Sequence, residues 1–441
     1  MSERQHAYLV VDPETARLRV ALEDSLPDPV TAVEAGLNVG DPVPEHLRVH
    51  HGNWLAWPHR RWAFTHVDEL RASARITARG PVGDPLPDAR TVGADGTVGL
   101  EEFEGLAVDD GDGGTWSLPE MLHHTYADGF LVVYRGEVVA EWYGDGMDRS
   151  TRHIMFSMTK TVTGVLALLA IHDGLMGLDD PLVDHVPELA DSAFAPVTVR
   201  QALDMTDGIR FDEDYASPDS DIGRYGIAMS FTPVPSGWDG PVGVHEGILA
   251  LTERAAPPGE AFAYKSVTTD VLAWATARAT GQRWVDGVSE RIWSSMGAEV
   301  DAAVVLDDRG IAVSSGGMSC TLRDLARFVR MLGRSGRVGA GDDERRAIPA
   351  AVADDVAAGG DPAGDIAEAY PTRAGWTYHR QCWNARHVLG GLVQMGIGGQ
   401  RAFCHPEEDL VVATFGSHPV AGNALTDPIF TSLVRGILAR T

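Results

Sequence analysis

The stretch Phe156-Ser157-Met158-Thr159-Lys160 opens the most apolar helix that the sequence predicts, residues 158–172. On a helix, residues three apart lie on one face, so the Lys160 amine can reach the Ser157 hydroxyl. A hydroxyl needs such a base before it can attack a carbonyl carbon. The positive helix end disfavours the ammonium form and lowers the pKa of Lys160. We therefore interpret Ser157 as a nucleophile and Lys160 as its base, on a helix buried in the middle of a domain.

The alternative is a purely structural role for both side chains. Ser157 would then cap the helix, and Lys160 would be a solvated residue of the first turn. The first turn favours acidic residues and repels a cation, which argues against that role. Composition argues the same way, because only Lys160 and Lys265 among the 36 basic residues are lysines. Arginine cannot accept a proton, since its pKa is far too high.

Length and composition limit the class of protein. The chain has 441 residues and is 44% hydrophobic, enough for a large core in one domain or in two to three smaller ones. A net charge of −27 argues against nucleic acid and anionic membranes as partners. The apolar run 165–171 is too short to span a bilayer, and no basic start followed by an apolar run opens the chain. We expect a cytoplasmic protein.

Few residues suit a metal site or a disulfide. The three cysteines, Cys320, Cys382 and Cys404, are too few and too scattered for a disulfide framework or a four-ligand zinc site. Adjacent histidines on an extended chain point to opposite faces, so the pairs at 50–51 and 123–124 do not favour a metal. We expect reduced, buried cysteines and no metal.

Two segments, 1–110 and 178–335, are predicted to form an arm and a helical lobe. Residues 1–110 show little periodicity and are expected to wrap around the same domain, with three tryptophans in 53–67 as anchors. Residues 178–335 are mainly helical, with helices near 269–280 and 284–296. Within this lobe, 207–244 is predicted to be an irregular, acidic loop.

The remaining segments predict an antiparallel sheet. Residues 130–143 form two strands around Arg135-Gly136. The expected strands of the C-terminal part, before a final helix at 425–439, are 377–383, 389–395, 401–405 and 410–415. Residues 336–370 are expected to be mobile surface. The predicted fold class is therefore α+β: an antiparallel sheet with the nucleophile helix (111–177 and 336–441), flanked by helices, with the helical lobe 178–335 inserted.

Two further segments can face a pocket. In an extended Tyr264-Lys265-Ser266, the phenol and the Ser266 hydroxyl point to the same side. At 394–399 a predicted strand ends in glycines, which let a ligand approach the backbone so that N–H groups point at an oxyanion. The structural alternatives are an aromatic residue in a loop for the first segment and a bulge or turn for the second.

Taken in order, these segments resemble the penicillin-recognising serine hydrolases with the class C β-lactamase fold, and most of all the 6-aminohexanoate-dimer hydrolase group. The matching segments are 53–67, 152–164, 264–272, 316–319 and 396–400. The resemblance implies a β-lactamase/DD-peptidase-like fold without a cofactor. It also implies that Ser157 is the nucleophile, Lys160 its base and Tyr264 the proton relay, and that the amides of Ser157 and Ile397 form the oxyanion hole.

The sequence departs from the β-lactamase pattern at two positions. Tyr-x-Ser replaces Tyr-x-Asn, and Gln394 stands where those enzymes carry the Lys of Lys-Thr-Gly. Without that lysine the pocket should disfavour anions such as a β-lactam carboxylate. The acidic run 212–214, with Asp219 and Asp221, is either a solvated loop or a group that holds a substrate ammonium at the pocket mouth. The residues predicted to line the substrate pocket are Ser266, Gly396, Gln394, Tyr215 and Asp214.

The expected activity is hydrolysis of a linear amide, such as a 6-aminohexanoate oligomer, or of an ester through a Ser157 acyl-enzyme. A carboxylesterase, a β-lactamase or DD-peptidase and an acyltransferase are alternatives on the same fold. A non-catalytic binding or sensor protein is the alternative from another class. The only partner expected is the small-molecule substrate, with a homodimer left open.

Overall fold

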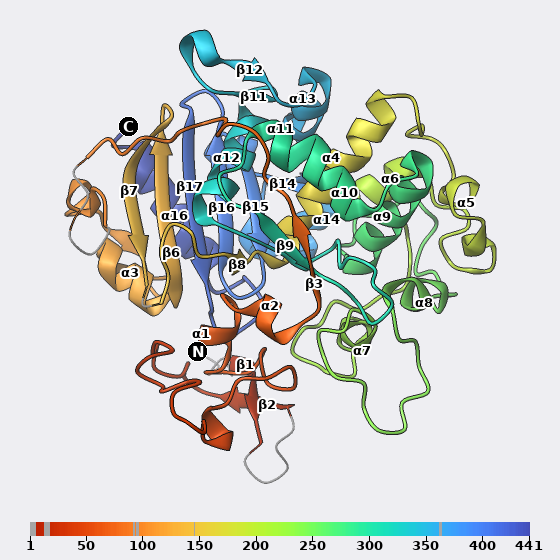
Figure 1. Ribbon diagram of the computed structural model, residues 1–441, viewed down its shortest axis with the longest axis horizontal. Coiled ribbons are helices and arrows are strands. Elements are labelled where there is room, and N and C mark those ends of the chain that lie inside the picture. The colour runs from red at the N-terminus through yellow and green to blue at the C-terminus, as the bar shows by residue number, and fades with distance from the viewer. Residues whose placement is uncertain (1–5, 13–17, 91–92, 94–96, 145, 361–363) are drawn as a thin grey trace.

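A seven-stranded antiparallel sheet forms the centre of the computed structural model, which describes residues 6–12, 18–90, 93, 97–144, 146–360 and 364–441 (Figure 1). The strand order is β13-β14-β15-β16-β17-β6-β7. The strands are β6 (Ala127–Tyr134), β7 (Glu137–Tyr143), β13 (Thr377–His379), β14 (Cys382–Asn384), β15 (Leu392–Gly396), β16 (Gln400–His405) and β17 (Leu410–Gly416). β17, from the C-terminal part of the chain, pairs with β6, which precedes the helical region, so one sheet contains strands from both parts. The α+β fold class is confirmed.

The predicted strand 377–383 is instead a hairpin of β13 and β14. Arg380 and Gln381 both have positive φ, 51° and 64°. Two such residues in succession form the turn that matches the twist of a tight hairpin. Thr377 therefore pairs with Asn384, and the chain reverses within the predicted strand.

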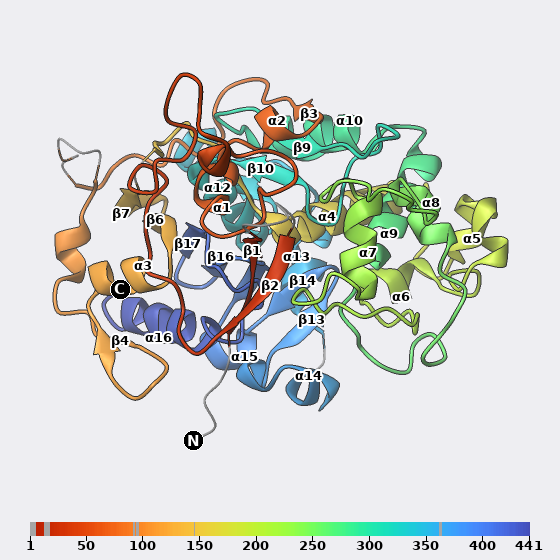
Figure 2. The ribbon, with the colours of Figure 1, turned by 90° about the horizontal axis from the view of Figure 1, so that it is seen from below.

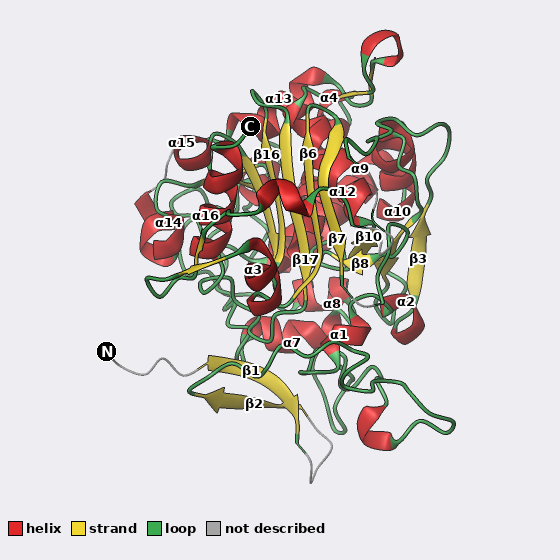
Figure 3. Ribbon diagram, turned by 90° about the vertical axis from the view of Figure 1, so that its left-hand side faces the viewer, coloured by secondary structure: helices red, strands yellow, loops and turns green. Residues whose placement is uncertain are grey.

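Helices cover both faces of the sheet. Alternate residues of β6 face opposite sides, so Phe130 packs with α3 and α16, and Leu131 packs with α4 and α12. Figure 3 shows α3 and α16 beside the strands. The bounds are α3 (Leu118–His124), α4 (Thr159–His172), α12 (Leu322–Gly333) and α16 (Asp427–Leu438). Burial on both faces explains the continuous apolar run in β6.

The helical region between β7 and β13 is built around α9 (Ser266–Thr280), which packs on α4. Its helices are α5 (Leu182–His185), α6 (Val199–Leu203), α7 (Asp221–Ala228), α8 (Val244–Leu249), α9 (Ser266–Thr280), α10 (Trp284–Val288) and α11 (Ser294–Met296). The expectation of irregular chain throughout 207–244 was wrong, because α7 lies within it. The Ser220 hydroxyl caps α7 by accepting from the Gly223 N–H at 3.1 Å. The helix buries Ile222 and Tyr225.

A second, four-stranded sheet runs through this region and holds the nucleophile segment. Its order is β3-β9-β10-β8, with β3 (Ser73–Ile76), β8 (His153–Ile154), β9 (Ala302–Val305) and β10 (Met318–Cys320). The Met155 N–H donates to Met318 O at 2.9 Å. This contact brings the residues around Ser315 next to Ser157, although they lie far apart in the chain.

The N-terminal residues form an arm along one end of the sheet, where β1 (His6–Val11) and β2 (Leu18–Glu23) form a hairpin near α7 (Figure 2).

Residues 336–370, expected to be mobile surface, include α13 (Ala350–Ala358), whose Val352 and Val356 are buried in the main core. The remaining elements are α1 (Arg60–Ala63), α2 (Val67–Leu70), β4 (Val108–Asp109), β5 (Thr115–Trp116), β11 (Arg337–Val338), β12 (Arg345–Arg346), α14 (Gly364–Ala369) and α15 (Arg386–Leu389).

Three further observations concern the described residues. All three cysteines are free and buried. No described helix has the length and apolarity needed to cross a membrane. Within the described ranges, no three His, Cys, Asp or Glu side chains are grouped so that they could hold a metal ion.

Candidate active site

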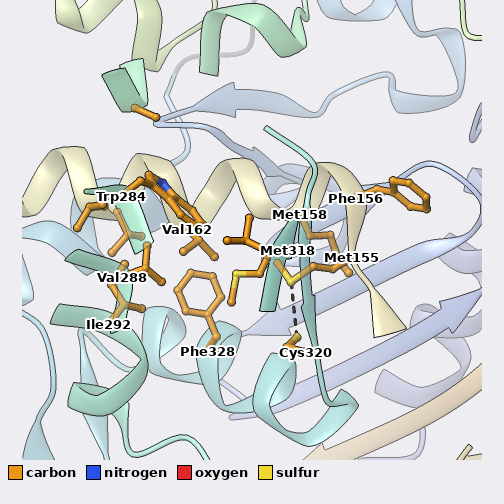
Figure 4. Packing of buried hydrophobic residues seen from close by; sticks show 14 of the residues in the cluster. Met155, Phe156, Met158, Val162, Trp284, Val288, Ile292, Met318, Cys320 and Phe328 are labelled. Carbon is orange, nitrogen blue, oxygen red and sulfur yellow. Dashed lines mark hydrogen bonds between the residues drawn. The ribbon is translucent and has the colours of Figure 1, made fainter. Parts of the chain in front are cut away.

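Ser157 lies in a short 3₁₀ turn, residues 156–158, that leads directly into α4. Phe156 has a positive φ of 42°, a strained conformation for an aromatic residue. Packing on two sides holds this turn. The ring of Phe156 contacts Trp54 and Phe64, and Met155 lies 3.5 Å from the Cys320 thiol. Figure 4 shows the Phe156 ring pointing away from the other labelled residues of the same cluster, which include Met155. Strain of this kind persists only where the surroundings hold it, and it is typical of functional sites.

Lys160 is the centre of the site. Its Nζ donates to Ser157 Oγ at 2.9 Å, to Ser266 Oγ at 3.0 Å and to Ser315 O at 2.8 Å. The side chain is only 1% exposed. Burial lowers the pKa of Lys160 to about 8, although the negative charges of Glu213 and Asp270 oppose the shift. An amine with this pKa can hold or release a proton near neutral pH.

Tyr264 lies close to both Ser157 and Lys160. Its phenol interacts with the Ser157 hydroxyl, and its ring centroid lies 5.1 Å from Lys160 Nζ. Tyr378 and Trp383 pack against the ring with centroid distances of 5.8 and 5.7 Å. Burial raises the pKa of Tyr264 well above its usual value. The phenol therefore keeps its proton at neutral pH, and Lys160 is the better base of the two.

The alternation expected for residues 264–266 places Lys265 on the opposite side. Lys265 is extended, with φ −147° and ψ 126°, and directly precedes α9. Tyr264 and Ser266 meet Ser157 and Lys160, whereas Lys265 Nζ donates to Asp207 Oδ1 at 2.9 Å. One short segment thus contributes two groups to the site and one to a buried ion pair.

Two carboxylates support the site from behind. The Ser266 N–H donates to the Glu213 carboxylate. Asp270, one turn after Ser266 on α9, accepts from the Ser315 hydroxyl at 2.7 Å. Burial raises the pKa of both carboxyl groups. Sequence reasoning missed the roles of Ser315 and Asp270. The spacing from Ser266 to Asp270 was an available signal, because residues four apart share a helix face.

The predicted oxyanion-hole residues lie where two segments meet. Ser157 and Ile397 both line one large cavity. The end of β15 approaches the nucleophile turn closely, since a Cβ on Gly396 would lie 2.5 Å from Met155 O. Only glycine fits there. The absence of a side chain at Gly396 is what lets the following residue, Ile397, reach the cavity wall.

The predicted pocket residues separate into two groups. Tyr215 and Ser266 line the cavity, with the Tyr215 phenol 3.5 Å from Ser266 Oγ. Gly396, Gln394 and Asp214 are not among its described lining residues. Gln394 is buried on β15 with 2% exposure. The exposed Asp214 carboxylate accepts from the Ala216 N–H at 2.9 Å and so stabilises a local turn. Asp219 and Asp221, further along the same segment, line the cavity instead.

Comparison with known proteins agrees with this geometry. The model of the family described as Beta-lactamase matches residues 120–428. The chain belongs to the beta-lactamase family. It is 32% identical, over 368 residues, to the 6-aminohexanoate-dimer hydrolase of Paenarthrobacter ureafaciens, covering 83% of this chain and 88% of that protein. The family resemblance expected from the sequence is confirmed.

Two solved structures show a similar fold. A Bacillus anthracis protein assigned as a 6-aminohexanoate-dimer hydrolase superposes with a TM-score of 0.75 and 26% identity, over 90% of this chain and 99% of that one. A penicillin-binding protein homologue from Caulobacter crescentus superposes with a TM-score of 0.54 and 19% identity, over 73% and 96%. The second likeness concerns the fold alone.

Proposed function

We propose that this protein is a serine hydrolase that cleaves linear amide or ester bonds through an acyl-enzyme on Ser157. The observation that carries the proposal is the arrangement around Lys160. Its buried amine lies 2.9 Å from Ser157 Oγ and has a pKa of about 8. A nucleophile and a base within hydrogen-bond reach, with the base held by further groups, are the signature of nucleophilic catalysis.

The first half of the reaction forms the acyl-enzyme. Neutral Lys160 accepts the proton of Ser157 as Oγ attacks the carbonyl carbon. The carbonyl oxygen becomes an oxyanion, which the N–H groups of Ser157 and Ile397 are proposed to bind. The Tyr264 phenol, which interacts with the Ser157 hydroxyl, passes a proton to the leaving amine or alcohol as the bond to the carbonyl carbon breaks. Lys160 then returns its proton to the relay.

The second half releases the acid. Water takes the place of the leaving group and attacks the acyl carbon, and the same groups accept its proton. Ser157 leaves with a proton, which restores the free enzyme. If another alcohol or amine replaces water, the same step transfers the acyl group. Product analysis with added nucleophiles separates hydrolysis from transfer.

We propose a preference for linear substrates over β-lactams. Gln394 is neutral where the β-lactamases carry a lysine, and it is buried and does not line the cavity, so this position presents no cation to a substrate. Loss of one charge-assisted contact, about 1.5–3 kcal/mol, weakens anion binding about ten- to hundredfold. Of the acidic residues expected to pair with a substrate amine, Asp219 and Asp221 line the cavity and Asp214 does not. Exposed pairs of this kind contribute little.

Intact mass after incubation with a fluorophosphonate tests the enzyme proposal. We expect one adduct, located on Ser157, and none in Ser157→Ala. An unmodified wild-type protein would favour a binding or sensor role. A panel of a cephalosporin, a p-nitrophenyl ester, a neutral linear amide and a 6-aminohexanoyl amide then tests the preference through kcat/KM. A cephalosporin as the best substrate by a wide margin would overturn the linear-substrate proposal.

A further inference from the structure

The cavity that begins at Ser157 is much larger than the reacting groups require. Its volume is about 1100 Å³, above the ~300–1000 Å³ typical of pockets that bury drug-sized ligands. It extends from Ser157 and Ser266 past α7 to Trp238 and to the N-terminal hairpin at Leu9. A substrate can therefore place a large group well beyond the bond that is cleaved.

The walls of this cavity suit an uncharged, apolar group. Its apolar side chains include Phe64, Phe156, Phe211, Ile227, Met229 and Phe231. The charged residues on the wall balance, because three are arginines and three are aspartates: Arg19, Arg60, Arg224, Asp219, Asp221 and Asp239. Arg60 is already bonded to the carbonyls of His418 and Pro419. A wall with equal numbers of positive and negative residues does not attract an ion. Transfer of apolar surface from water to this wall lowers the free energy.

Specific contacts hold two walls of the cavity together. Trp54 of the N-terminal arm donates from Nε1 to Phe231 O at 2.6 Å, and His51 Nε2 lies 3.0 Å from Ser230 O. These bonds join the arm to the segment after α7, which Figures 1 and 2 show near each other. The Trp238 indole donates to Pro241 O at 3.2 Å. The space is therefore bounded by packed and bonded segments.

Resting on the function proposed above, we propose that the preferred substrates are amides or esters that carry a long, uncharged apolar group on one side of the scissile bond. This group lies in the cavity between α7 and the N-terminal arm. The class goes beyond short 6-aminohexanoyl amides, which leave most of the cavity unused. The arm and α7 then determine specificity, whereas Ser157 and its partners carry the chemistry.

Two substrate series test the proposal. p-Nitrophenyl esters from acetate to dodecanoate lengthen the acyl side, and N-alkyl acetamides lengthen the amine side. Each methylene that leaves water raises kcat/KM by about fourfold, so we expect at least a hundredfold rise from acetate to octanoate or across the matching amides. A flat or falling trend in both series would overturn the proposal. Fluorophosphonate labelling and acetate turnover show separately whether Ser157 is active.

A variant at Gly226 tests where the apolar group lies. Gly226 is buried on α7 and lines the cavity, yet a Cβ there meets only Thr232 Oγ1, at 3.6 Å. Gly226→Leu therefore adds volume into the cavity. We expect the octanoate-to-acetate ratio of kcat/KM, or the matching amide ratio, to fall at least tenfold. Ala351→Leu, exposed on α13, is the matched control and should keep the wild-type ratio.

A second substitution covers the case in which Gly226→Leu does not fold. Val234 lines the cavity and is 44% exposed, so Val234→Asp does not disturb the core. The new carboxylate charges the apolar rim, and the same ratio should fall severalfold. Unchanged ratios in Val234→Asp and in folded Gly226→Leu would show that the long group lies elsewhere and would overturn the assignment.

Discussion

The two lysines of this chain are both buried, but their partners differ. Lys160 is 1% exposed and donates to two serine hydroxyls and a backbone carbonyl. Lys265 is 2% exposed and donates to the Asp207 carboxylate at 2.9 Å. A direct carboxylate partner stabilises the ammonium form, whereas neutral oxygen acceptors leave much of the cost of burial uncompensated. Burial without a directly bonded carboxylate is therefore what lets the Lys160 amine be neutral near pH 8.

Substitution by arginine should give the largest difference between the two lysines in its effect on kcat/KM. Lys160→Arg keeps a charge and loses the ability to be neutral, so kcat/KM should fall by about three to four orders of magnitude. The matched control is Lys265→Arg, which keeps a cation beside Asp207 and should stay within a few fold of wild type. Rates are normalised to folded protein. Activity within tenfold of wild type in Lys160→Arg would remove Lys160 from the role of base.

Removal of the Asp207 carboxylate, the partner of Lys265, should lower the stability of the protein. Asp207 is fully buried and accepts from Lys265, from the Thr268 hydroxyl and from the Ile209 N–H. Asp207→Asn leaves the Lys265 charge buried without its partner, which should lower the free energy of unfolding by about 3–5 kcal/mol. Urea denaturation measures the loss.

A double variant sharpens the stability prediction. Asp207→Asn with Lys265→Met removes both charges and should recover much of the stability. If the single variant lost less than about 1 kcal/mol, the pair would not be the buried ion pair that its geometry indicates. If the double variant stayed as unstable as the single one, the loss would come from the hydrogen bonds of Thr268 and Ile209.

The arrangement of the residues around Lys160 was predictable from the sequence because it depends on local periodicity. Three-residue spacing on a helix brings Lys160 to Ser157, and alternation in an extended segment brings Tyr264 and Ser266 to one side. The same alternation places Lys265 on the other side. The apolar runs of the sheet were also readable, since strands buried on both faces are continuously hydrophobic.

The remaining parts depend on long-range contacts and on turn geometry. The acceptor at Ser315 is a backbone carbonyl, and any residue carries one, so no residue type marks it. Gly223 and Gly226 weaken the helical pattern of α7, whose start Ser220 caps in the structure. Gln394 was predicted to line the pocket because it occupies a family position. Which residues border the cavity depends on how strands and loops pack around the cavity, and the sequence does not show that packing.

The pH dependence of activity should follow Lys160. Burial lowers its pKa to about 8, and only the neutral amine accepts the Ser157 proton. kcat/KM for a neutral substrate should therefore rise about tenfold per pH unit up to about pH 8 and then level off. At pH 6 it should be about a hundredfold below the plateau. A flat profile between pH 6 and 9 would mean that another group is the base.

The smallest predicted effect is a shift of that profile in Asp270→Asn. Glu213 and Asp270 are the carboxylates whose charges raise the pKa of Lys160, and Ser157, Ser266, Ser315 and Tyr264 face the amine as neutral groups. Removing the Asp270 charge leaves less to stabilise the ammonium, so the pKa of Lys160 falls further. The acid limb should move about half a unit to one unit to lower pH.

Asp207→Asn is the matched control for this shift, since it also replaces a buried carboxylate and Asp207 is bonded to Lys265 instead. Its acid limb should stay in place even though the protein is less stable. A general loss of packing would lower the plateau in both variants without moving either limb. A limb that stays at about pH 8 in Asp270→Asn would show that this carboxylate only orders the hydroxyls of Ser314, Ser315 and Tyr225 and does not tune the base.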